Sequence, residues 1–422
     1  MQISRKNIFD GIALTTIKTN KFKFNRVFID FILPLEREHA AENALFTSVL
    51  LRGTKKHENL LSIQKALSAL YGAEVDSYVG TSGEAHVITV YAKLLANRYA
   101  LRGEDITGGV ISLLKEIIKE PKTENGVFDS AYVENEKEKL ITDIEAQIND
   151  KDSFALKRCT EIMCANEAWG VSEIGKKEDV AKITPASLFE RYKYVLSHAK
   201  AEVFVIGDIE ENDAEAFVRD MFADTERGEI PDYSTKIITE VGEVKSVCEH
   251  QSLNQGKLVL GFRTGIGGYE ADYDVLRVLN GVFGAGTQSK LFRNVREKLS
   301  LCYHCSSRIY TKGVMMVTSG IKVSNYEKAK SEIFVQLDAV KTGDFTDDEL
   351  QIAKSFIVNS YNSFFDSPYM LRDYYYGQKF CTNKDSLEDA IDKVNNVTRQ
   401  DIIDAFSYIT ADTVYFLKGK EA

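Results

Sequence analysis

The histidines are the residues from which a catalytic metal site would be built, and their spacing argues against such a site. A helical zinc site of a peptidase takes two histidines four residues apart on one helix face, with a glutamate between them as general base. The chain has six histidines, and no two are four residues apart: His39, His57, His86, His198, His250 and His304. The sequence therefore predicts that this chain binds no catalytic zinc ion by itself.

Residues 291–306 hold a second group of side chains that could take part in chemistry, and they read L-F-R-N-V-R-E-K-L-S-L-C-Y-H-C-S. Arg296 can pair with a carbonyl oxygen or a tetrahedral intermediate, and Tyr303 can hydrogen-bond the same group. Donors of this kind contribute most where negative charge develops during a reaction. The alternative is structural, with Arg296 paired to a nearby glutamate and Tyr303 packed in a sheet.

Two cysteines in the same segment, Cys302 and Cys305, form a C-x-x-C pattern. This pattern is typical of a thiol redox site or of half a zinc site. We expect a strand from residue 301, on which side chains alternate, so that Cys302 and Cys305 should face opposite ways. No second C-x-x-C completes a tetrahedral site. The favoured interpretation is two free structural thiols, with redox or metal use as the alternative.

Residues 291–306 also resemble the V-R-E-K-x-x-L-x-Y segment of insulinase/pitrilysin-type zinc peptidases, in particular the processing-peptidase branch. Active members of that family carry H-x-x-E-H a few residues before a Gly-Thr pair. The matching stretch here precedes Gly53-Thr54, and it places Ala44, Thr47 and Ser48 at the positions of the first ligand, the catalytic glutamate and the second ligand. Alanine and serine cannot replace two imidazoles, and threonine cannot accept a proton from zinc-bound water at neutral pH. The resemblance implies a degenerate motif with no cofactor in this chain.

The third zinc ligand of the family is a glutamate on a later helix. Residues 134–145 resemble that helix, and Glu138 and Glu145 lie seven residues apart, near one helix face. The separation of Glu145 from Ser48 is longer than is usual in the family. Two interpretations stay open: these carboxylates are relics of a lost metal site, or they belong to an ordinary solvated acidic helix face.

For Arg296 and Tyr303 the resemblance implies a role in substrate binding. In active relatives the arginine and tyrosine of this segment reach from the second domain towards the peptide substrate near the zinc. Heterodimeric processing peptidases divide the work between one zinc-bearing subunit and one silent subunit. The resemblance therefore implies a silent partner of an active, zinc-bearing homologous peptidase subunit, similar to paired proteins of Gram-positive bacteria. The alternatives are a non-enzymatic peptide-binding or scaffold protein, and a degenerate homodimer.

The predicted elements occur in the same order in both halves of the chain. In the first half we expect strands at residues 15–19 and 26–33, helices at 42–51 and 60–70, strands at 75–79 and 86–94, helices at 107–118, 132–150 and 185–196, and a strand at 202–206. In the second half we expect a strand at 257–262, a helix at 272–283, strands within 313–323, helices at 325–341, 347–363 and from 397, and a closing strand at 413–417.

This repetition predicts an α+β fold of two similarly folded domains, each a β-sheet with flanking helices, that form a clamshell around a cavity. The first domain is predicted at residues 1–228, with the degenerate zinc motif. The second is predicted at residues 229–422, with the Arg296/Tyr303 segment. Residues 226–236 are polar and contain glycine and proline, which is typical of a linker.

Composition narrows the class of protein further. The net charge of −10 disfavours non-specific nucleic-acid binding, which needs a basic surface. No run of 18 apolar residues and no apolar signal core occurs, so we expect a cytoplasmic protein without a membrane segment. Six cysteines in 422 residues do not form a disulfide framework.

Overall fold

The computed structural model describes residues 1–268, 270, 272–378, 380 and 385–419, and its chain divides into two compact units. The first unit is Met1–Ala146 with Val171–Ser234, and the second is Gln147–Gly170 with Thr235–Ala422. This division differs from the predicted 1–228 and 229–422 in two segments: residues 229–234, which fall in the first unit, and residues 147–170. Residues 147–170 lie early in the sequence, yet they pack with the second unit.

The sheet of the first unit has six strands in the order β1-β2-β8-β3-β5-β4. Only β2 and β8 are parallel, and the other neighbours are antiparallel. Its strands are β1 Gln2–Phe9, β2 Ile12–Lys18, β3 Phe24–Pro34, β4 Glu74–Ser82, β5 Ala85–Leu95 and β8 Lys200–Gly207. The central strands β3 and β8 are buried along nearly their whole length, as expected for apolar, β-branched segments at the centre of a core.

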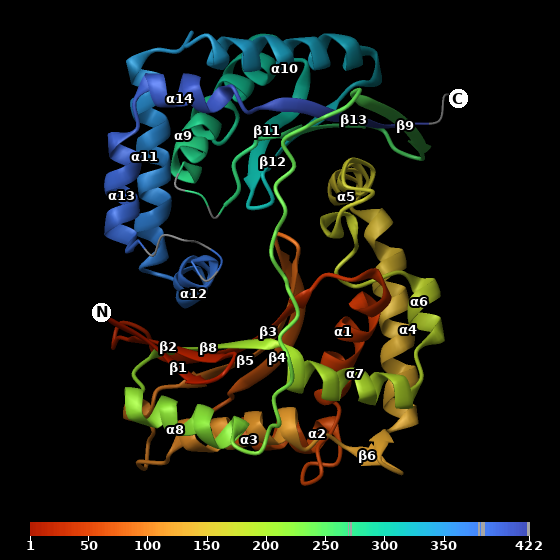
Figure 1. The fold of residues 1–422 in the computed structure, drawn as a ribbon, viewed down its shortest axis with the longest axis vertical. Helices are drawn as coiled ribbons and strands as arrows, with labels where there is room; N and C mark the ends of the chain where they lie inside the picture. Colours follow the sequence, from red (N-terminus) through yellow and green to blue (C-terminus); the bar gives the residue numbers. More distant parts are fainter. Residues whose placement is uncertain (269, 271, 379, 381–384, 420–422) are drawn as a thin grey trace. The chain divides into compact units, whose positions relative to one another are not determined.

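Helices and strand side chains of the first unit form one hydrophobic core. Its helices are α1 Arg37–Leu50, α2 Leu60–Ala69, α3 Ile106–Lys119, α4 Ser130–Ala146, α6 Lys177–Lys182, α7 Pro185–His198 and α8 Glu211–Phe222. Figure 1 shows α3 and α8 along one side of the sheet, and their apolar residues Leu114 and Phe217 belong to the same core as Ile29 of β3. A hairpin of β6 Thr123–Glu124 and β7 Val127–Phe128 precedes α4.

The sheet of the second unit repeats the topology of the first. Its five strands are β9 Lys245–Gln251, β10 Gly256–Arg263, β11 Cys302–Tyr310, β12 Val314–Ile321 and β13 Thr410–Gly419. They are ordered β9-β13-β10-β12-β11, with β9 and β13 parallel and the rest antiparallel. This is the order and sense of β2-β8-β3-β5-β4, so the prediction of two similarly folded α+β domains is confirmed. Strand β1 has no counterpart among the described strands of the second unit.

The helices of the second unit lie against this sheet and against one another. They are α5 Lys151–Met163, α9 Tyr273–Phe283, α10 Tyr326–Lys341, α11 Asp347–Phe364, α12 Pro368–Gly377, α13 Leu387–Asn396 and α14 Arg399–Phe406. Helix α9 follows β10 and precedes β11 in the chain, as α1 follows β3 and precedes β4 in the first unit. Figure 1 shows α9, α11 and α13 side by side, in agreement with their contacts.

Helix α5 joins the second unit through an apolar face. Ala155, Cys159 and Met163 are buried in one cluster with Val259 of β10 and Tyr415 of β13. Helix spacing places these three α5 residues on one face, because they are four residues apart. The sheet of the second unit is therefore covered by a helix from an earlier part of the sequence.

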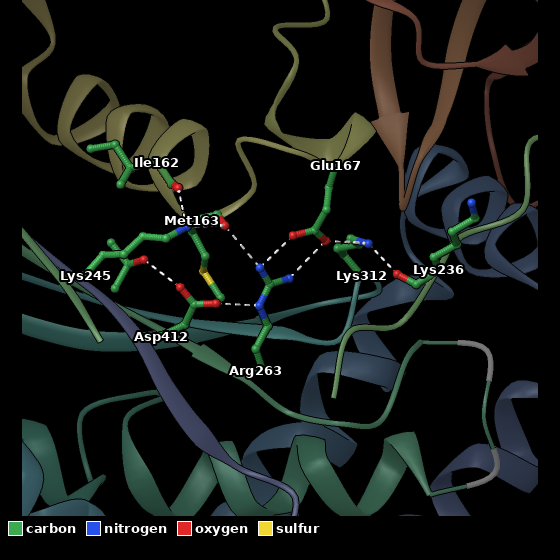
Figure 2. A network of polar contacts seen from close by, with 9 residues as sticks. Ile162, Met163, Glu167, Lys236, Lys245, Arg263, Lys312 and Asp412 are labelled. Carbon is green, nitrogen blue, oxygen red and sulfur yellow. Dashed lines mark hydrogen bonds and ion pairs between the residues drawn. The ribbon is translucent and has the colours of Figure 1, made fainter. Parts of the chain in front are cut away.

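A buried network of charged groups fixes the end of the same segment, as Figure 2 shows. Glu167 follows α5 and pairs with Arg263 of β10 at 2.6 Å and with Lys312 at 2.8 Å. Arg263 also pairs with Asp412 of β13 at 2.8 Å and donates to the carbonyl of Met163 at 3.2 Å. These cations hold the pKa of Glu167 below its usual range against the opposing effect of burial. A fully paired network of this kind orients the groups that it joins.

None of the helices in the described part of the chain combines the length and the apolar character that a membrane crossing requires.

Candidate functional site

The helix that carries the degenerate motif positions is α1, and it is buried on nearly all sides. Gly175 packs directly on this helix, since a Cβ built at Gly175 would lie 2.6 Å from the Cβ of Ala41. Gly175 also has a φ of +72°, which favours glycine.

The three motif positions on α1 provide no metal site. Ala44 and Thr47 are buried, and Ser48 is half-buried. The hydroxyl of Thr47 donates to the carbonyl of Ala44 at 2.9 Å, so its hydrogen is used within the helix. Among the residues that the structure describes, no group of three or more His, Cys, Asp or Glu could hold a metal ion.

The two carboxylates proposed as relics of the metal site, Glu138 and Glu145, are exposed on α4. Glu145 pairs with Lys177 at 2.9 Å, and both side chains are about half exposed. The buried carboxylate of α4 is instead Glu136, whose side chain is 3 % exposed and forms an ion pair with Arg52 in the segment after α1. Glu136 was not among the residues predicted from the sequence. An acidic residue on the apolar side of α4, beside Val133, was the available signal.

A buried polar chain lies directly beside the motif helix, and it too was missed from sequence. Asn43, the neighbour of Ala44, contacts Nδ1 of His86 on β5 at 3.0 Å. Arg191 on α7 donates to Oδ1 of Asn43 at 2.8 Å. Burial, and then the charge of Arg191, lower the pKa of His86 to about 4. His86 is therefore neutral at pH 7 and acts as a hydrogen-bonding group inside the first unit.

The Arg296 segment forms a π-helix over Leu291–Lys298 in the second unit. Such helices are rare and occur often at functional sites. It ends where the N–H of Leu299 donates to the carbonyl of Asn294 at 3.1 Å, and Ser300 follows with a φ of +50°. The guanidinium of Arg296 lies over the ring of Phe292, 4.4 Å from its centroid, and 3.7 Å from the carboxylate of Glu297. Its side chain is 39 % exposed.

Tyr303 projects from a β-bulge at the start of the edge strand β11. Cys302 pairs with Ile321 of β12 and His304 pairs with Gly320, so Tyr303 is the extra residue between them. Tyr303 is 60 % exposed, and its hydroxyl has no hydrogen-bond partner within the described residues. Tyr303 is therefore not packed in the sheet, whereas Arg296 makes the local glutamate contact that the structural alternative expected.

The bulge overturns the expected orientation of the two cysteines. An unbroken strand would direct Cys302 and Cys305 to opposite faces, but the extra residue returns them to the same face. The two thiols influence each other's titration, and Cys305 lies opposite Ser319 of β12. The interaction with the neighbouring thiol lowers the pKa of Cys302 and, with burial, raises the pKa of Cys305.

Comparisons with known proteins agree with this geometry. Residues 182–357 match the family described as the Peptidase M16 inactive domain. The chain is 35 % identical over 417 residues to the probable inactive metalloprotease YmfF of Bacillus subtilis, covering 99 % of this chain and 98 % of YmfF. The chain belongs to the inactive branch of the M16 peptidase family. The M16 membership confirms the insulinase-like resemblance in the sequence.

Solved structures show the same fold over the whole chain. A conserved protein from Enterococcus faecalis superposes with a TM-score of 0.91 at 26 % identity, covering 99 % of each chain. A peptidase M16 inactive domain from Pseudomonas fluorescens gives 0.81 at 15 % identity, covering 100 % of this chain and 99 % of that chain. The second likeness concerns the fold alone.

Membership of this M16 branch and the side chains on α1 both indicate that the chain has no catalytic zinc site. A chain with Ala44, Thr47 and Ser48 at the motif positions offers neither the two imidazoles nor the general base of an M16 zinc site. It is a non-catalytic metalloprotease homologue. What the second unit still offers is a pair of exposed donors, the guanidinium of Arg296 and the phenol of Tyr303.

Proposed function

We propose that this chain is the silent subunit of a peptidase heterodimer, and that it lends Arg296 and Tyr303 to a peptide-cleaving cavity shared with a zinc-bearing M16 sibling. The observation that carries the proposal is the contrast between the two units. In the first unit the motif positions hold buried side chains that cannot bind zinc. In the second unit Tyr303 is exposed, and its hydroxyl has no partner among the described residues.

The geometry of the second unit suits the proposed role of these donors. Stacking on Phe292 restricts the plane of the Arg296 guanidinium, and the bulge directs Tyr303 away from the sheet. Donors that are already oriented lose little entropy when they bind the substrate, and they stabilise the negative charge that develops on its carbonyl oxygen. In this role neither residue needs a metal in its own chain.

A relative of this chain supports a zinc-bearing protein as the proposed partner. The chain is also 24 % identical over 233 residues to an uncharacterised zinc protease, YmxG of Bacillus subtilis, covering 54 % of this chain and 56 % of YmxG. Sequences of this kind therefore include proteins named as zinc proteases as well as proteins named as inactive. We propose a zinc-bearing homologue of that kind as the partner, a peptide as the substrate, and the bacterial cytoplasm as the location.

The test is a reconstituted heterodimer assayed on a peptide substrate. We expect the zinc-bearing subunit to gain activity when this chain is added. Arg296→Ala and Tyr303→Phe should each slow turnover about a hundredfold, since one oriented donor to an oxyanion contributes roughly 3 kcal/mol. Folding and pairing of the subunits should not change, and both are measured in parallel by circular dichroism and size-exclusion chromatography.

Two matched variants control this experiment. Arg293→Ala removes an arginine from the same π-helix, where its side chain is 53 % exposed and pairs with Glu349. Tyr408→Phe removes a phenol that is 55 % exposed elsewhere in the second unit. Both controls should retain turnover. Full turnover of the Arg296 and Tyr303 variants would reject the shared site.

A second candidate is a non-enzymatic scaffold or peptide-binding protein, and the contact of Arg296 with Glu297 favours it. An arginine held by a local carboxylate has less to offer a substrate. In that case the zinc-bearing subunit would be equally active alone and in the complex, and Glu297→Gln would leave turnover unchanged. Under the shared-site proposal, Glu297→Gln should raise the turnover of the heterodimer, because it frees Arg296 from its local carboxylate.

A further inference from the structure

The register of β11 against β12 brings Cys302 and Cys305 onto one face of the sheet. Cys305 lies opposite Ser319, and Cys302 lies opposite Ile321. Residues two apart on a strand point to the same face, so Ser319 and Ile321 share a face and so do the cysteines paired with them. The extra residue at Tyr303 makes this arrangement possible, because three residues of β11 span two residues of β12.

This arrangement brings the two cysteines close to disulfide distance. Two residues of strand extend about 6.6–6.8 Å, whereas three residues without a bulge would extend about 10 Å. A disulfide needs Cα atoms about 4.4–6.8 Å apart. The register against β12 therefore places the pair near the upper limit of that range.

The two thiols differ in the way that an attacking and a resolving cysteine differ. Cys302 is half-buried, and the charge of Arg296 acts on it, whereas Cys305 is 3 % exposed. The lowered pKa of Cys302 raises the fraction of thiolate, which is the nucleophile. The raised pKa of Cys305 keeps that thiol protonated until a neighbouring sulfur is oxidised.

We propose that Cys302 and Cys305 form a dithiol that a hydroperoxide oxidises reversibly to an intramolecular disulfide. The Cys302 sulfur attacks the terminal peroxide oxygen, the O–O bond breaks, and the product is a sulfenic acid on Cys302 with water or an alcohol as leaving group. The Cys305 sulfur then attacks the Cys302 sulfur, the S–S bond forms, and the sulfenic oxygen leaves as water. Two electrons pass from the two sulfurs to the peroxide, and a small dithiol reductant reverses the step.

Closure of this disulfide would act directly on Tyr303, which lies between the two cysteines. A covalent link across the bulge shortens the distance between its ends and limits the backbone angles of the extra residue. The proposal therefore adds an oxidant-sensitive site to the segment that presents Tyr303. It does not depend on the proposed peptidase partner.

Peptide mapping of the isolated chain tests the proposal. Trypsin cleaves after Lys298 and Arg308, and residues 299–308 contain both cysteines and no other. The reduced chain is treated with a few equivalents of hydrogen peroxide, blocked with N-ethylmaleimide and digested. We expect this peptide to lose two hydrogens and to carry no maleimide, and we expect dithiothreitol to restore the doubly labelled form.

Three controls make the outcome decisive. In Cys305→Ser the reaction should stop at a sulfenic acid on Cys302, which dimedone traps. In Cys302→Ser the peptide should keep one maleimide on Cys305. The exposed lone Cys248 is the internal reference. If residues 299–308 remain doubly labelled at peroxide doses that oxidise Cys248, the proposal is wrong. It is also wrong if the urea-unfolded chain closes the disulfide as fast as the folded one.

Discussion

Single residues explain why the helix that carries the motif positions is a packed part of the core without a zinc site. Ala44 fills its position with a methyl group in a packed helix, and the hydroxyl of Thr47 is satisfied by the carbonyl of Ala44. Sequence reasoning could predict this loss, because the motif is local and its chemistry is strict. It could not find the neighbouring chain of Asn43, His86 and Arg191, whose members come from three elements far apart in sequence.

His86 predicts a defined pH dependence of stability. Its pKa of about 4 in the folded state lies below the value of about 6.5 expected in the unfolded chain. The stabilisation is therefore complete above pH 6.5, falls progressively as the pH drops below 6.5, and is lost once the pH has fallen through 4. Between pH 7.5 and 4 the unfolding free energy of the native chain should fall about 3 kcal/mol more than that of His86→Gln. Urea denaturation at a series of pH values measures the difference.

The exposed His250 provides the control for this experiment. His250→Gln makes the same substitution at the protein surface, so it separates the effect of burial at His86 from the effect of losing an imidazole. Parallel curves for the native chain and His86→Gln would show that burial of His86 does not shift its titration.

The motif residues predict the metal content of the purified protein. Neither Ala44 nor Ser48 supplies an imidazole, and Thr47 supplies no carboxylate, so extensively dialysed protein should contain far less than one zinc per chain. Elemental analysis by mass spectrometry measures this ratio. About one zinc per chain, retained after dialysis, would contradict the assignment of a silent subunit.

At the scale of elements, hydropathy periods predicted most strands and helices but not how they associate. The expected strand at residues 26–33 is β3, and the expected helix at 42–51 is α1. The bulge at Tyr303 escaped prediction, because only Cys302 of β11 precedes it and no run of alternating side chains is interrupted there. Helix α5 was also missed, since the charged helix predicted at 132–150 ends instead at Ala146 and a new helix begins at Lys151.

Glu167 predicts how strongly the segment after α5 is held. Glu167→Gln leaves Arg263 and Lys312 without a carboxylate that both contact, and removal of one partner from a buried ion pair costs about 3–5 kcal/mol. The unfolding free energy in urea should fall by about 3 kcal/mol. Glu190→Gln is the matched control, since Glu190 pairs with Lys193 on the surface and such pairs contribute about 0–1 kcal/mol. Equal effects of the two substitutions would mean that the network does not hold the segment.

At the scale of the whole molecule, two sheets share one strand order, and the repeated order of predicted elements anticipated this duplication. The bounds of the two units could not all be predicted from the sequence. The chain passes between them after Ala146, after Gly170 and after Ser234. Only the last of these passages has the polar, proline-containing composition that is typical of a linker. A fragment of residues 1–228 would therefore carry α5 without the strands that cover its apolar face.

The early position of α5 in the sequence has a consequence during protein synthesis. The first unit has all its strands once β8 is made, but α5 must wait for β13, the last strand of the chain. At about 5–20 residues per second, that wait lasts tens of seconds. Throughout this interval Ala155, Cys159 and Met163 present an apolar surface to solvent beside a unit that can already fold. The nascent chain is therefore most in need of a chaperone between the completion of its first unit and the release of its C-terminus.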